Sequence, residues 1–198
     1  MLAVSSQRHT RGPSLASHGR WVSRSTLGMA RTGDLETDRR LRTRARRAAL
    51  QELAAVYRGA DAAYRPYSCP GTGECCQLAT TKHEPWLWPI EWEALLAAKG
   101  GQLPSERADG GCPFLAEDGK RCSVYTARPF GCRTFFCHRI QGPAREPVDA
   151  VAGLSARLER VAQTHEPDCP GPRPLLAWAR DAWHQAEARS GAVLEALR

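Results

Sequence analysis

The residues of this 198-residue chain that are most able to do chemistry are its cysteines. Seven of the eight lie between residues 69 and 137, within or beside the phrases C-P-G-T-G-E-C-C, G-C-P-F-L and R-P-F-G-C-R-T-F-F-C. Dense thiols in a reducing compartment most often bind Zn²⁺ or an iron–sulfur cluster. The sequence therefore predicts a metal site formed from thiolates, with these candidate ligands: Cys69, Cys75, Cys76, Cys112, Cys122, Cys132 and Cys137.

The rest of the sequence favours a reducing environment for these thiols. No apolar run approaches the roughly 20 residues that a membrane span needs, and the N-terminus lacks the continuous apolar segment of a secretory signal. We therefore expect a cytoplasmic protein without a membrane segment. Because the even count of eight cysteines would also suit a secreted fold, a disulfide-bonded protein remains the alternative.

The first phrase brings three of these thiols together in a glycine-rich loop. Gly71 and Gly73 allow the backbone to fold over a metal, so that Cys69 can meet Cys75 or Cys76. In an extended backbone the side chains of the two adjacent cysteines would point apart. Either one of them is a ligand and the other packs, or the pair spans two ions or one multinuclear cluster.

A β-hairpin is predicted over residues 112–125, with its turn at residues 117–119. A two-residue turn would place Cys122 opposite Leu115, so that Cys112 and Cys122 face opposite sides of the ribbon. A three-residue loop with Gly119 in the left-handed conformation would place Cys122 opposite Phe114 and both thiols on one face. We predict the second register if the two thiols share a site.

Other residues near the cysteines could assist them. His138 could be a nitrogen ligand or a proton donor, although a surface or core role is more common, and the same holds for His83. Cys169 stands apart and is expected to be a free or packed thiol, with a late metal ligand as the alternative. Cations that could stabilise thiolate charge flank the later cysteines: Lys120, Arg121, Arg128, Arg133 and Arg139.

The formal net charge of +7 is concentrated near the N-terminus. Residues 1–33 hold five arginines and no acidic residue, and without them 23 positive residues face 21 negative ones. Because the cysteine-bearing part is nearly neutral, the charge argues against nucleic acid as a partner. The arginine run over residues 39–47 fits a solvated helix face, with an RNA or anion contact as the alternative. Translation could start at Met1 or at Met29.

Apolar periodicity predicts helices around the cysteines, over residues 37–58, 89–99, 148–164 and 174–189. Gly59, Gly100, Gly101 and Gly191 are the expected helix ends. The tryptophans at positions 86, 88 and 92 fit core packing better than a platform for stacking bases.

These elements predict a small α+β fold, with mostly helical flanks around a cysteine-rich, metal-organised core that contains a short β-hairpin. The expected division is a disordered basic tail (residues 1–33), an N-terminal helix (34–65), a metal-binding domain (66–140) and a helical extension packed on it (141–198).

The cysteine phrases, followed by K-R-C-S-V-Y, resemble the YkgJ-type cysteine-cluster family over about residues 66–140. The resemblance implies a zinc- or iron-chelating domain with a C-x-x-C-x-x-C-C signature, sometimes described as an iron–sulfur oxidoreductase. It places family cysteines at Cys69, Cys75, Cys76, Cys112, Cys122 and Cys132. Thr72 stands where the family has its second signature cysteine, and Cys137 is the candidate substitute.

The leading hypothesis is a protein that binds zinc or iron, as ions or as an iron–sulfur cluster, and that could also have a protein partner. One alternative is an iron–sulfur oxidoreductase or group-transfer enzyme. The other is a zinc-stabilised module that binds nucleic acid or protein. The sequence contains no P-loop, dinucleotide-binding or H-E-x-x-H motif, so it does not decide whether the protein is an enzyme.

Overall fold

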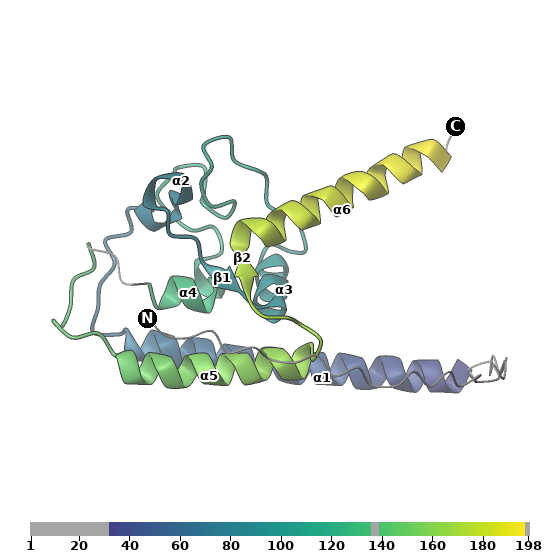
Figure 1. The fold of residues 1–198 in the computed structure, drawn as a ribbon, viewed down its shortest axis with the longest axis horizontal. Helices are drawn as coiled ribbons and strands as arrows, with labels where there is room; N and C mark the ends of the chain where they lie inside the picture. The colour runs from purple at the N-terminus through teal and green to yellow at the C-terminus, as the bar shows by residue number, and fades with distance from the viewer. Residues whose placement is uncertain (1–31, 136–138, 197–198) are drawn as a thin grey trace, which may run out of the picture.

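Two long helices form one side of the molecule. The computed structural model describes residues 32–135 and 139–196, and in it α1 (Thr32–Ala63) lies antiparallel to α5 (Val148–His165) (Figure 1). Leu53 and Val56 of α1 pack against Leu158 and Val161 of α5, in a first hydrophobic cluster that also contains Ile90. The N-terminal part of α1 extends beyond the end of α5, and residues 36–48 are exposed.

Gly59 does not end the first helix, so that prediction was wrong. The helix continues to Ala63, and a methyl group at Gly59 would lie 2.6 Å from Cδ2 of Leu154 in α5. The missing side chain thus allows close helix packing, which a pattern within one helix cannot reveal. Gly100 and Gly101 do follow a helix end, because α3 (Pro89–Ala98) stops just before them and both have left-handed φ angles of +67° and +80°.

The other side of the molecule is built on α3, α6 (Leu175–Ala196) and a two-stranded sheet. Strand β1 (Trp86–Leu87) pairs antiparallel with β2 (Arg173–Pro174), with Trp86 opposite Pro174. A second hydrophobic cluster joins these elements, with Leu87, Leu95, Phe114, Val124, Leu175 and Ala179 among its members. The described residues therefore form a small α+β fold, as predicted.

Two details differ from the sequence-based predictions. The last helix is not broken at Gly191 but runs to Ala196. Of the three tryptophans, Trp92 is buried in the second cluster and Trp88 packs against the first, but Trp86 is 58% exposed. Trp86 lies in a two-residue strand whose alternate position, Leu87, takes the buried side.

The cysteines lie in short elements between the long helices. These elements are η1 (Glu74–Cys76), α2 (Leu78–Thr81), η2 (Tyr125–Ala127) and α4 (Phe130–Arg133). No regular hairpin forms over residues 112–125, where a single antiparallel bridge joins Leu115 and Cys122. Among the described residues, no helix is long and apolar enough to cross a membrane.

Candidate metal centre

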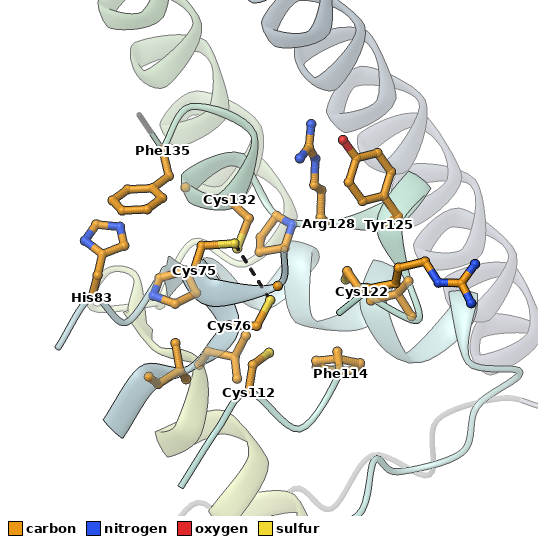
Figure 2. A pocket seen from close by; sticks show the side chains of 18 of the residues that line it. Cys75, Cys76, His83, Cys112, Phe114, Cys122, Tyr125, Arg128, Cys132 and Phe135 are labelled. Atoms are coloured by element: carbon orange, nitrogen blue, oxygen red, sulfur yellow. Dashed lines mark hydrogen bonds between the residues drawn. The ribbon is translucent and has the colours of Figure 1, made fainter. Parts of the chain in front are cut away.

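Six cysteines line one cavity of about 310 Å³ between the short elements (Figure 2). The structure thus brings together every predicted ligand that it describes: Cys69, Cys75, Cys76, Cys112, Cys122 and Cys132. Cys137 and His138 lie outside the described residues. Cys169 does not line the cavity; its thiol donates to the carbonyl oxygen of Gly171 at 3.3 Å, as fits the predicted free or packed thiol.

The adjacent thiols of Cys75 and Cys76 converge, with their Sγ atoms 4.0 Å apart (Figure 2). The prediction that they point apart assumed an extended backbone, whereas both residues lie in the 3₁₀ helix η1. Gly73 sets this helix against the turn that precedes Cys122. Its φ is +72°, and an added methyl group would lie 2.5 Å from the carbonyl oxygen of Gly119. Only glycine fits this approach without strain.

Cys112 and Cys122 both line the cavity, but the pairing of the segments that carry them differs from the predicted register. Because Cys122 pairs with Leu115, the prediction of Phe114 as its partner was wrong. Cys112 precedes the paired segment, in a turn in which the amide of Leu115 donates to the carbonyl oxygen of Cys112 at 2.9 Å. The alternation of faces along a ribbon therefore does not apply to Cys112. Its own amide donates to the carbonyl oxygen of Cys76 at 2.7 Å, which ties the two segments together.

Cys132 is carried by α4, whose first amide is held by a buried carboxylate. Glu91 Oε1 accepts hydrogen bonds from the amide of Phe130 at 2.7 Å and the hydroxyl of Tyr57 at 3.0 Å, and Oε2 accepts one from the amide of Trp88 at 3.1 Å. Glu91 is fully buried. It thereby fixes the start of α3 to the start of α4, two residues before Cys132.

The thiols perturb one another electrostatically. A hydrogen bond to Cys76, together with burial, raises the pKa of the Cys75 thiol. A hydrogen bond with Cys112 is the largest cause that raises the pKa of Cys76, to about 12. Burial, followed by the charges of Cys76, Cys122 and Cys75, raises the pKa of Cys132. A cation among these groups would remove both the desolvation penalty and the mutual repulsion of the thiolates.

Of the five flanking cations, Arg128 is the one that acts on several thiols, because it lowers the pKa values of Cys75, Cys122 and Cys132 against the larger upward effects. Three of the others form ion pairs with carboxylates instead. Arg121 pairs with Asp118, Arg133 with Asp61 and Arg139 with Glu74. Proximity in sequence therefore overestimated the positive charge available to the thiols.

The donor set fits a soft or borderline metal, although its present arrangement is not a finished coordination shell. Thiolates suit zinc, iron and iron–sulfur clusters. Within the described residues, no three Cys, His, Asp or Glu side chains converge closely enough to hold an ion. His83 also lines the cavity, with its ring stacked at 3.8 Å on Phe135. Metal binding here would require the thiols to close in on the ion.

Residues 68–153 match the model of the CxxCxxCC family, described as "Putative zinc- or iron-chelating domain". This segment is therefore similar to that family. The match confirms the resemblance drawn from the cysteine phrases and extends it beyond residue 140 into α5. Thr72, at the position of a family cysteine, is exposed and does not line the cavity. No curated protein and no solved structure matches the chain.

Sequence reasoning missed Glu91 as a residue that positions the site. A signal was present, because Glu91 is the third residue of a helix that begins with Pro89, where a carboxylate commonly reaches back to the preceding amide. Its further hydrogen bonds to Tyr57 and Phe130 could not be foreseen, because those residues lie 34 and 39 positions away.

Proposed function

We propose that this protein binds zinc or iron through the thiolates of its CxxCxxCC domain. The observation that carries the proposal is the convergence on one cavity of six cysteines from four separate parts of the chain. Three of these parts are held by their own contacts: η1 by Gly73, residues 112–122 by the Cys112–Cys76 backbone bond and the Leu115–Cys122 bridge, and α4 by Glu91. The family description supports the same chemistry.

Metal binding would couple to local folding. The thiols with raised pKa values are protonated at neutral pH, so the ion must displace their protons and draw the sulfur atoms together. Structural zinc contributes roughly 10–16 kcal/mol of apparent binding free energy in small domains, which is enough to drive such a rearrangement. We propose that the metal organises the cysteine-rich core of residues 66–140, on which the helices of the flanks pack.

A second candidate is a polynuclear centre, including an iron–sulfur cluster with redox or group-transfer activity. The observation that favours it is the number of thiols, since one tetrahedral ion needs four ligands and six cysteines line the cavity. The converging pair Cys75 and Cys76 could also bridge two metals. Reduced thiols are required in either case, and this supports a cytoplasmic location.

The two candidates are separated by anaerobic purification of the full chain, followed by elemental analysis and a visible spectrum. Colourless protein with stoichiometric zinc supports the first, whereas iron with sulfide and a visible absorption band supports the second. Protein that holds neither metal after reconstitution contradicts both. Replacing Cys132 by Ser should lower the metal content, and the matched replacement Cys169→Ser should leave it unchanged, because Cys169 does not line the cavity. Equal loss in both variants would also contradict the proposal.

The role of Cys137 needs its own variant, because this residue lies outside the described part of the structure. If Cys137 substitutes for the family cysteine replaced by Thr72, Cys137→Ser will lower the metal content while Thr72→Ser will not. Unchanged metal content in Cys137→Ser would mean that the described cysteines complete the site.

A further inference from the structure

A second cavity, of about 450 Å³, lies against the first and shares part of its wall. The shared residues include three of the thiols, Cys69, Cys75 and Cys132, together with Tyr125 and Arg128. The opposite wall comes from the end of α1 and the residues that follow it. A molecule in this second cavity would therefore contact the thiols from the side that faces α1.

Three arginines and one aspartate line the second cavity. Asp61 is the one carboxylate among the described residues that line it, and both of its oxygens accept from Nη1 of the buried Arg133, at 2.7 and 2.6 Å. Arg65 and Arg128 also line the cavity, and neither pairs with a carboxylate of the described residues. The lining therefore has positive charge that its own acidic group does not neutralise.

Arg128 is the decisive residue, because its Nε atom is buried and has no hydrogen-bond partner among the described residues. A buried, unpaired donor is costly, and no group of the described residues compensates the Nε atom. The guanidinium lies 4.2 Å from the centre of the Tyr125 ring. In Figure 2, the guanidinium of Arg128 and the hydroxyl of Tyr125 point the same way, away from Cys76 and Cys112.

We propose that the second cavity binds a small oxyanion, a carboxylate or a phosphate, between Arg65 and Arg128 and next to the metal-binding thiols. The anion accepts from the terminal nitrogens of the Arg128 guanidinium and provides the negative charge that Asp61, already paired, does not. Arginine is suited to this role because its guanidinium presents several donors in a fixed plane. The presence of a metal next to the anion rests on the proposed function. The anion site itself depends only on Arg65 and Arg128.

The test is calorimetric titration of the full, metal-loaded chain in NaCl at about 150 mM, which is on the order of physiological ionic strength. One arm uses inorganic phosphate as the probe, and the other uses benzoate. We expect saturable binding of at least one probe. Phosphate alone or benzoate alone supports the proposal and identifies the chemistry. Replacing Arg65 by Gln should weaken binding by about tenfold or more, since a charge-assisted hydrogen bond is lost.

The matched control is Arg58→Gln, which removes an exposed arginine of α1 that does not line the cavity. Tyr125→Phe removes only a hydroxyl at the cavity and should weaken binding less than Arg65→Gln does. No saturable binding of either probe, or equal weakening by Arg58→Gln and Arg65→Gln, would overturn the proposal. The metal content of each sample separates the two proposals, because loaded protein that binds no anion refutes only the anion site.

Discussion

The replacement of Glu91 by Gln tests whether one buried carboxylate holds the two helix starts together. The substitution keeps the shape of the side chain and exchanges one oxygen for an NH₂ group. The amide oxygen can still accept from Tyr57 and Phe130, where Oε1 now accepts at 3.0 and 2.7 Å. The NH₂ group then faces the amide of Trp88, which donates to Oε2 at 3.1 Å in the native protein. One hydrogen bond is lost, and two donors are left facing each other.

The expected cost is about 1–3 kcal/mol of the free energy of unfolding, the usual penalty for a buried polar group left unsatisfied. For a chain of this size, the midpoint of thermal unfolding falls by roughly 2–4 °C for each kcal/mol. Thermal and urea unfolding, followed by circular dichroism, would measure the change. Glu93→Gln is the matched control in the same helix. Glu93 pairs with the exposed Arg46 through Oε1 and lies 3.4 Å from Nε2 of His165 through Oε2, and pairs of the first kind contribute below about 1 kcal/mol.

The pH dependence provides a second, independent readout. Burial raises the pKa of Glu91. Stability from this group is therefore fully present below the unfolded-state pKa, near about 4.3, and is lost as the pH rises through the folded-state value. The stability gap between the native protein and Glu91→Gln should be largest at the acidic end and narrow as the pH rises. A gap as small as that of Glu93→Gln, or one that widens with pH, would refute this account of Glu91.

Three further predictions concern the surroundings of the thiols. Gly73→Ala should destabilise the protein by about 1–3 kcal/mol more than Gly71→Ala. Both glycines have left-handed φ angles, but only a methyl group at Gly73 would collide with the backbone. Urea unfolding of the two variants measures this difference. Arg133→Gln removes a buried guanidinium that pairs with Asp61 and should lower the free energy of unfolding by about 2–3 kcal/mol. Arg157→Gln breaks an exposed pair and should lower it by less than about 1 kcal/mol. Similar losses in both variants would contradict a larger role for the buried pair. Zinc binding should release protons and become tighter as the pH rises, because neighbouring groups raise the pKa of thiols such as Cys76. Calorimetry in buffers of different ionisation enthalpy counts the released protons. A measurement of no released protons would contradict the protonated state of the thiols.

Local signals in the sequence predicted the long helices and the group of cysteines that line the first cavity. Apolar periodicity located α3 and α5 to within one residue at each end, because each helix buries one continuous face. The cysteines were predictable as a group, since several thiols in one short stretch have few other uses. The family resemblance rested on the same residues and was confirmed.

The features that were not predictable depend on residues distant in the chain. Gly59 looks like a helix end until Leu154 of α5 is placed against it. The β1–β2 pair joins residues 86–87 to residues 173–174, and no periodicity within either segment indicates the other. The orientation of Cys75 and Cys76 depended on whether the backbone was extended or helical, and the contact of Gly73 with the 119–120 turn accompanies the helical form.

The position of the thiols relative to the two hydrophobic clusters indicates what a metal would add to stability. Cys132 follows Phe130, which belongs to the first cluster with α1 and α5, whereas Cys112 belongs to the second cluster with α3 and α6. A metal held by both cysteines would therefore cross-link the two clusters. Glu91 already joins them through hydrogen bonds, since it lies on α3 and holds the amide of Phe130. If the metal is structural, its removal should destabilise the contact between the clusters more than either cluster alone, and hydrogen exchange should show the first losses of protection in α4 and residues 112–124.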